Sequence, residues 1–332
     1  MFPLTLPLGQ GLCSARSGMS EGDHIMIPMV SFAGRMSYCL TRSLKMVLGH
    51  HGLEYPTPWL ECVGGQAFEF VYVQREGDLF ALIGDYYHLA GERMLGTLNV
   101  GYRYTSAEDD ASALDALRLA LERGPVAAGM LDMGYLSYIP HHQALRGSDH
   151  AVAVLGLDGA GVVLHDPAGY AAVALPLADF LAAWRRDIYT GRPYGLWQVD
   201  AIGPQPSEEQ TWHEVVAQAR ARLAQPAVAT PEATVHYGPA AMRALAHDIA
   251  AHPERGIEGL RHFCWQVSAQ RCLDSAFFVR PRLPRAADVR WRQCQIYGRL
   301  QHATAAQQRA ALPDLLGQLA AHEEEFIAAL GG

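Results

Sequence analysis

The sequence lacks long uninterrupted apolar runs and concentrated basic segments. No stretch approaches about 18 consecutive apolar residues, the length that a membrane-spanning helix needs. The run Met1-Phe2-Pro3 carries no basic residue, and Pro3 and Pro7 interrupt what would have to be the apolar part of a secretory signal. The formal net charge is −8, whereas neutralising phosphates needs a basic surface. We therefore expect a cytoplasmic protein that binds neither membranes nor nucleic acid.

Closely spaced ligand motifs are missing as well. The six cysteines do not have the tight spacing of a zinc knuckle or of a disulfide scaffold, so we expect free thiols. The pairs His50-His51 and His141-His142 have no third ligand at a fixed spacing. We expect neither a metal nor a cofactor. The cysteines are Cys13, Cys39, Cys62, Cys264, Cys272 and Cys294.

The composition is that of an ordinary folded protein. Half of the 332 residues are apolar and 18% are charged, and the length favours two domains over one small core. The later part of the chain has helical periodicity, and Ser207 with Gln210 resembles a capping box at the start of a helix. The expected division is a loosely structured segment at 1–30, a mixed helix and strand domain at 31–203, a linker with a connecting helix at 204–234, and an α-helical domain at 235–332.

A helix is predicted to start at Cys39. Leu40, Leu44 and Val47 recur at intervals of three and four, and Gly52 follows as a C-terminal stop. A thiol attacks an acyl carbon well only as the thiolate, which the unpaired N–H groups and the dipole of a helix start favour. The same N–H groups can hold the oxyanion of a tetrahedral intermediate. Cys39 is therefore a candidate nucleophile.

The sequence around His150 and Asp166 has the pattern of a β-hairpin. An alternating apolar run follows His150, turn residues surround Asp158, and a second apolar run leads back to Asp166. An odd-length turn centred on Asp158 would place His150 directly opposite Asp166, whereas a two-residue turn would point Asp166 away. We expect the first register, in which Asp166 orients His150 as the general base for Cys39.

Each of these three residues also has a structural explanation. A cysteine at a helix start is more often a small buried apolar residue than a nucleophile, a histidine before an apolar strand is usually structural, and Asp-Pro is a common turn dipeptide. The occurrence of Cys39, His150 and Asp166 together, each in a compatible element, favours the catalytic interpretation.

Four segments together carry a resemblance to a known family. In their order and spacing they resemble the N-terminal domain of butirosin biosynthesis protein H, over about residues 31–203, and the helical remainder is similar to the domain often joined to it. The resemblance implies the α+β class, with a papain-like cysteine-protease fold distantly similar to the C39 peptidases: an N-terminal helix packs on an antiparallel sheet, and an all-α domain follows. The segments are Cys39 to Gly52, Gly64-Gly65 with Phe68 and Tyr72, Asp132 to Tyr138, and His150 to Asp158 with Asp166-Pro167.

The resemblance also implies an activity. The expected enzyme is an acyltransferase of secondary metabolite biosynthesis, which takes an acyl group from the phosphopantetheine thioester of an acyl carrier protein, or from a CoA-like thioester, and passes it to a small amine. The acyl group would rest on Cys39 between the two steps, and no further cofactor is needed. A papain-like peptidase or amidase with the same three residues is the first alternative. A catalytically inactive papain-like binding module is the second.

The segment before Cys39 departs from the family pattern. The papain-type oxyanion glutamine would lie near Ala33, and Ser37-Tyr38 stand where the family commonly has a histidine. The candidates for the second oxyanion donor are the side chains of Ser37 and Arg35 and the backbone N–H of Cys39.

Six residues are candidates for substrate binding. A carboxylate and phenols suit a cationic amine acceptor, although a strand end with tyrosines that pack outward would explain the same residues. The candidates are Asp132, Tyr135 and Tyr138, together with Gly64, Gly65 and Phe68 from the segments that carry the resemblance.

Overall fold

The computed structural model describes Met29 and residues 38–331, except for short internal segments. The expected lead-in at 1–30 therefore lies, apart from Met29, outside the described residues. All described residues from Tyr38 onward belong to one compact unit, and its division near residue 203 stays a prediction. None of the helices in the described ranges has the length and apolar character that crossing a membrane requires. The internal segments left out are 77–78, 85–86, 159–160, 187–191, 231–232 and 261–262.

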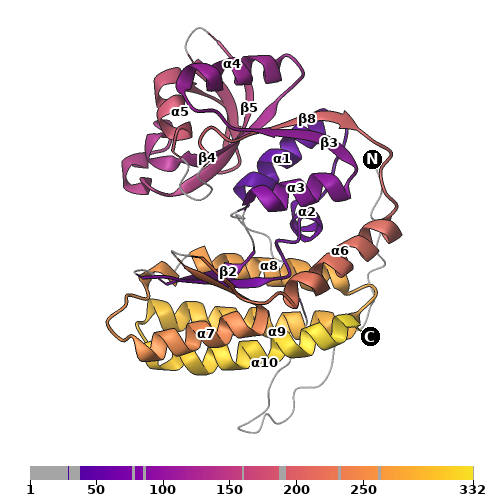
Figure 1. Cartoon of the computed structure of the whole chain (residues 1–332), viewed down its shortest axis with the longest axis vertical. Coiled ribbons are helices and arrows are strands. Elements are labelled where there is room, and N and C mark those ends of the chain that lie inside the picture. The colour runs from indigo at the N-terminus through magenta and orange to yellow at the C-terminus, as the bar shows by residue number, and fades with distance from the viewer. Residues whose placement is uncertain are drawn as a thin grey trace, which may run out of the picture. The chain divides into compact units, whose positions relative to one another are not determined.

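The first part of this unit is built around a six-stranded antiparallel sheet (Figure 1). Its strand order is β3-β8-β4-β5-β6-β7, which makes β4 and β5 the central strands. Every residue of β4 is buried, and because strand side chains alternate in direction, both faces of the sheet are covered. The strands are β3 (Val100–Thr105), β4 (Val126–Asp132), β5 (Asp149–Leu157), β6 (Gly161–Asp166), β7 (Tyr170–Pro176) and β8 (Leu196–Ile202).

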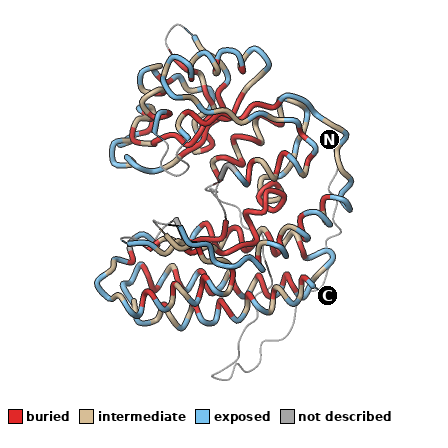
Figure 2. Tube along the Cα trace, viewed as in Figure 1, coloured by how far each residue is buried: buried red, intermediate tan, exposed pale blue. Residues whose placement is uncertain are grey.

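Helices cover the two faces of this sheet. Ala127 and Ala153 pack in a cluster with residues of α1, α2 and α3, whereas Val126 and Ala128 pack in a second cluster with residues of α4 and α5. Figure 2 shows the buried positions along the central strands between these helices. Helix α1 contacts β5 and β4, which brings its start to the central strands. The helices are α1 (Cys39–His50), α2 (Thr57–Val63), α3 (Tyr87–Thr97), α4 (Asp110–Leu121) and α5 (Leu177–Trp184).

A second, four-stranded antiparallel sheet joins segments that are far apart in the chain. Its order is β2-β1-β10-β9, and Val71 of β1 pairs with Tyr237 of β10. Phe70 and Tyr72 are buried against the C-terminal helices. The expectation of a purely α-helical second domain is therefore wrong, because β10 falls within it and β1, β2 and β10 pack on its helices. The strands are β1 (Phe70–Gln74), β2 (Phe80–Ile83), β9 (Val228–Ala229) and β10 (Thr234–Tyr237).

The C-terminal region is otherwise helical, as expected. Its helices pack around a core that includes Trp265 and Tyr297. The predicted capping box is confirmed, because the Ser207 side chain accepts from the Gln210 backbone and the Gln210 side chain accepts from the Ser207 backbone. The chain thus has a mixed α/β structure with antiparallel sheets and a helical C-terminal region. The helices are α6 (Glu208–Leu223), α7 (Gly238–Ala251), α8 (Phe263–Val279), α9 (Pro284–Ala305) and α10 (Leu312–Gly331).

Candidate active site

Cys39 is the first residue of helix α1, as the sequence predicts. Tyr38 occupies the N-cap position but gives the helix no side-chain hydrogen bond, and the described first turn of α1 has no acidic side chain. The first N–H groups of the helix therefore receive no cap from the Tyr38 side chain, and the positive end of the helix favours an anion. Cys39 is a free, partly buried thiol at this end. The oxyanion candidates Arg35 and Ser37 lie outside the described residues.

His150 lies on the central strand β5, where it pairs with Leu131 of β4 and is 7% exposed. Its Nε2 donates to Oδ1 of Asp166 over 2.7 Å, since a carboxylate can only accept. The thiol of Cys39 also acts on the ring, since hydrogen bonding and charge from Cys39 are among the causes that raise the pKa of His150. The structure thus brings a thiol, an imidazole and a carboxylate together in series.

The hairpin between His150 and Asp166 does not have the predicted register. Near the turn, Leu157 faces Val162. If this pairing continued without a break, Asp166 would lie opposite Ala153, and its side chain would point to the face opposite that of His150. The predicted direct opposition of His150 and Asp166 is therefore wrong.

A β-bulge at Leu155 brings the two side chains back to one face. The bulge places one extra residue in β5, so that beyond it Ala153 faces His165. Asp166 follows His165 directly, and its side chain comes to the same face of the sheet as that of His150, as a diagonal neighbour. The bulge is thus the local feature that allows the contact.

Asp166 is held by two further hydrogen bonds. The backbone N–H of Ala168 donates to Oδ1 over 2.6 Å, and the hydroxyl of Tyr138 donates to Oδ2 over 2.8 Å. Burial and the charge of Asp166 raise the pKa of Tyr138. Tyr138, predicted as an acceptor-binding residue, therefore supports the carboxylate that contacts His150.

The charges of the site favour a protonated imidazole. Burial lowers the pKa of His150, but the hydrogen bonds and charges of Asp166 and Cys39 outweigh burial and raise the pKa to about 10. Burial raises the pKa of Asp166, but the hydrogen bond and charge of His150, together with the hydrogen bonds from Ala168 and Tyr138, lower it by more, so that the pKa of Asp166 is lowered overall. At neutral pH the ring therefore carries a proton, and its positive charge favours the anionic form of a neighbouring thiol.

Removing the Tyr138 hydroxyl is expected to weaken the site without unfolding the protein. Tyr138→Phe deletes one hydrogen bond to the Asp166 carboxylate, so we expect the rate of Cys39 alkylation by iodoacetamide to fall about tenfold at neutral pH. Tyr170→Phe is the matched control, because the Tyr170 ring packs edge-on against Tyr138, with 5.2 Å between centroids, and Tyr138 keeps its bond to Asp166. An equal loss in both variants would contradict the assignment.

Two of the predicted acceptor-binding residues lie at the end of β4 and in the segment that follows it. Asp132 is 1% exposed, and its Oδ1 accepts from the backbone N–H of Gly134 at 2.8 Å and of Gly147 at 3.0 Å. That oxygen fixes this segment, which favours the structural explanation of Asp132. The guanidinium carbon of Arg146 lies 4.9 Å from the centre of the Tyr135 ring. Acceptor binding by Asp132 and Tyr135 stays a prediction.

The residues predicted from the paired glycines lie after helix α2. Gly64 is the C-cap of α2, and Gly65 has φ +75°, a backbone conformation that favours glycine. Phe68 is fully buried, and its carbonyl accepts from Nη2 of Arg290 over 2.5 Å. The structure therefore places the Phe68 ring in the core, where packing explains it.

Sequence reasoning missed the residues that hold the start of α1. The hydroxyl of Tyr38 donates to Oδ2 of Asp274 on α8 over 2.7 Å. The sequence marks Tyr38 only as a departure from the family pattern beside Cys39. Nothing marks Asp274, which lies 236 positions further along the chain.

Two family models match the chain. Residues 38–167 match the model described as "Butirosin biosynthesis protein H, N-terminal", and residues 231–331 match the "YobF C-terminal domain". The resemblance drawn from the sequence is confirmed, and the first matched range contains Cys39, His150 and Asp166. Over residues 38–167 the chain is similar to that N-terminal domain.

The chain is also similar to a curated protein of Bacillus subtilis (strain 168), described as "Uncharacterized protein YobF". The two are 30% identical over 160 residues, which cover 47% of this chain and 50% of the relative. The chain thus spans about half the length of the curated relative that it matches. The relative's name assigns no activity to it.

Proposed function

We propose that this protein is a cysteine-dependent acyltransferase with a papain-like catalytic domain. It moves an acyl group from the thioester of a carrier protein, or of a CoA-like donor, to a small amine in the biosynthesis of a secondary metabolite. The observation that carries the proposal is the hydrogen-bonded series of Cys39, His150 and Asp166 at the uncapped start of α1. The family match over residues 38–167 supports it.

In the first step the Cys39 sulfur attacks the thioester carbonyl carbon. The developing oxyanion accepts from the N–H groups at the start of α1. The bond between the carbonyl carbon and the pantetheine sulfur breaks, and the leaving thiolate takes the proton that His150 carries. The products are an acyl-Cys39 thioester, a neutral His150 and a free pantetheine thiol.

In the second step the amine attacks the acyl-Cys39 carbonyl carbon. Neutral His150 accepts the proton that the nitrogen loses, and the bond from the carbonyl carbon to the Cys39 sulfur breaks to release the amide. The sulfur leaves as a thiolate beside a protonated His150, so the starting pair is restored. Asp166 keeps the ring oriented throughout.

The test is incubation of the purified protein with acyl-pantetheine and acyl-carrier thioesters, followed by intact and peptide mass. We expect the mass of one acyl group on Cys39, and its loss as an amide after an amine is added. Absence of an adduct with every thioester would exclude the acyltransferase, and a Cys39 that iodoacetamide does not alkylate at about pH 6 would exclude Cys39 as a nucleophile as well.

A hydrolase is the second candidate, and one observation favours it. Of the groups predicted to bind the amine, the Oδ1 of Asp132 is occupied by backbone donors, and the Tyr138 hydroxyl is bonded to Asp166. Water is then a competing acceptor for the acyl group. Formation of free acid alone, at a rate that added amines do not change, would favour the peptidase or amidase over the acyltransferase.

A further inference from the structure

The residue immediately before Cys39 is fixed by a helix of the C-terminal region. Tyr38 is 1% exposed, and its hydroxyl donates to Oδ2 of Asp274 on α8. Tyr38 is the N-cap residue of α1, and its side chain makes no hydrogen bond to the first turn of the helix. The Tyr38 side chain therefore ties the start of α1 to α8 and does not occupy the N–H groups of that turn.

A second buried contact reaches the same turn from α8. The hydroxyl of Thr41 donates to Oε1 of Glu61 over 2.5 Å, and Oε2 of Glu61 accepts from Nε of Arg271 over 2.8 Å. Nη1 of Arg271 donates to the carbonyl of Ile83 over 2.6 Å, and the guanidinium lies 5.5 Å from the centre of the Tyr38 ring. Buried charges such as Glu61 and Arg271 are tolerated only with their partners in good geometry, so the arrangement resists displacement.

The Asp274 carboxyl titrates near neutrality. Burial and the charge of Glu61 raise the pKa of Asp274, whereas the hydrogen bond from Tyr38 and the charge of Arg271 lower it. Burial is the largest of these effects, and the resulting pKa is about 7. Cys294 on α9 also lies within reach of its charge. A carboxylate accepts a stronger hydrogen bond than a neutral acid does. The bond from Tyr38 to Asp274 therefore strengthens as pH rises through the pKa of Asp274.

We propose that Asp274 and Arg271 are positioning residues, which act through Tyr38 and Glu61 to fix the direction in which the Cys39 thiol meets His150. The two residues lie one turn apart on α8 and hold α1 on both sides of the nucleophile. The inference rests on the proposed function, because a small misalignment lowers the rate only of a group that reacts.

The test compares the alkylation of Cys39 by iodoacetamide in wild type, Tyr38→Phe and Asp274→Ala. Both variants remove the bond between hydroxyl and carboxyl, so we expect the rate constant to fall about tenfold, with a larger loss at about pH 8 than at about pH 6. Asp274→Asn keeps a neutral acceptor for the Tyr38 hydroxyl. It is expected to recover most of the rate and to lose this pH dependence.

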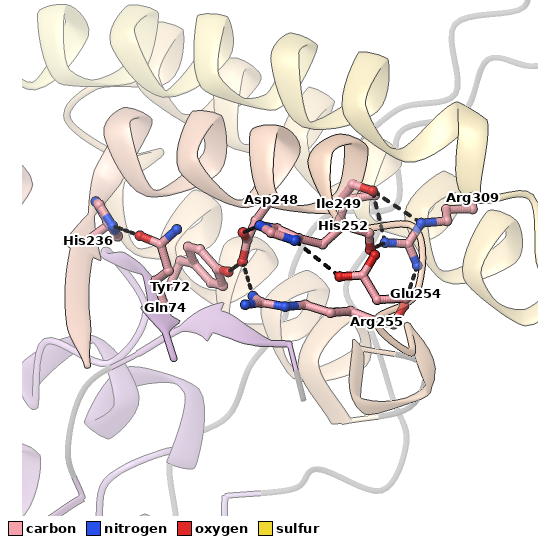
Figure 3. Close-up of polar contacts among 9 residues, drawn as sticks. All are labelled: Tyr72, Gln74, His236, Asp248, Ile249, His252, Glu254, Arg255 and Arg309. Atoms are coloured by element: carbon pink, nitrogen blue, oxygen red, sulfur yellow. Dashed lines mark hydrogen bonds and ion pairs between the residues drawn. The ribbon is translucent and has the colours of Figure 1, made fainter. Parts of the chain in front are cut away.

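Tyr72→Phe is the matched control (Figure 3). The buried hydroxyl of Tyr72 donates to Oδ2 of Asp248 and joins β1 to α7, in a cluster with His252 and Arg255 that does not include α1. The variant is expected to lower the urea midpoint as Tyr38→Phe does, but to leave the alkylation of Cys39 unchanged. An equal loss of alkylation in this control would overturn the inference, as would a Tyr38→Phe variant that reacts like wild type.

Deuterium uptake by α1 separates this inference from the proposed function. Tyr38→Phe is expected to increase uptake at the start of α1, whereas Tyr72→Phe is not. If alkylation and uptake both respond to Tyr38→Phe but no thioester forms an adduct, the acyltransferase is excluded and the positioning role stands. If adducts form on Cys39 while neither readout responds to Tyr38→Phe, the positioning role is excluded and the acyltransferase stands.

Discussion

Replacing Cys39 with alanine is expected to abolish the covalent acyl adduct and to lower acyl transfer by about ten-thousand-fold or more. Without the sulfur, the amine has to attack the thioester directly, and His150 and Asp166 no longer have a thiolate to stabilise. The measurements are intact mass after incubation with an acyl thioester and the initial rate of amide formation. The double variant Cys39→Ala/His150→Ala is expected to lose no more than Cys39→Ala, because the residues act as one unit.

His150→Ala is expected to change both the rate of Cys39 alkylation and the dependence of that rate on pH. The pKa of His150 is raised to about 10, so the imidazolium is present below that pH and is lost above it. Below that pH, wild type should therefore alkylate Cys39 faster than His150→Ala does, because the positive ring favours an anionic sulfur, and this advantage should be lost above it. In His150→Ala the alkylation should rise with pH as for an ordinary thiol, whose pKa is about 8.5. Parallel profiles in the two proteins would contradict the role of His150.

Cys294→Ala is the matched control for the nucleophile. Cys294 is also a partly buried free cysteine, but burial raises its pKa to about 11, and its sulfur lies 3.4 Å from the carbonyl oxygen of Ala269. Little thiolate forms there at neutral pH, so the variant should keep the adduct and the rate of wild type. An adduct that persists in Cys39→Ala and disappears in Cys294→Ala would move the nucleophile to Cys294.

The local signals of the site could be recognised in the sequence, but its exact pairing could not. The helical period after Cys39 and the alternating strand after His150 depend on neighbouring residues only, and both elements are present. The register of the hairpin depends on a bulge at Leu155, and the adjacent Gly156, which can mark a bulge within a strand, fits the start of a turn equally well. The predicted contact between His150 and Asp166 is therefore present, but the strand register from which it was predicted is not.

Contacts between distant segments lay beyond the reach of sequence patterns. Strand β1 at 70–74 pairs with β10, whose residues lie 160 or more positions further along the chain. The same limit applies to Tyr38 and Asp274. Asp132 and Tyr138 were predicted as acceptor-binding residues because their polar side chains suit an amine. In the structure Asp132 accepts from a backbone N–H group, and Tyr138 donates to the Asp166 carboxylate. The residue types showed that these side chains would form hydrogen bonds, but the hydrogen-bond partners depend on the fold.

Breaking the buried ion pair between α9 and α10 is expected to have the largest effect on stability. Arg290 and Glu323 are fully buried, and Nη1 lies 2.7 Å from Oε2. The amide of Gln293 also donates to Glu323 over 2.6 Å, and Arg290 donates to the Phe68 carbonyl. Glu323→Leu leaves the Arg290 charge buried without its partner, so the free energy of unfolding should fall by about 3 to 5 kcal/mol. Urea unfolding followed by circular dichroism measures it.

A surface pair on the same two helices supplies the control. Arg292 donates to both carboxylate oxygens of Glu325 at 2.8 Å, but the two side chains are 44% and 31% exposed. Glu325→Leu should therefore cost no more than about 1 kcal/mol. The double variant Arg290→Met/Glu323→Leu removes both buried charges and should recover about half of the loss, since the Phe68 carbonyl still lacks its donor. A double variant as unstable as Glu323→Leu would mean that lost packing, and not the unpaired charge, sets the cost.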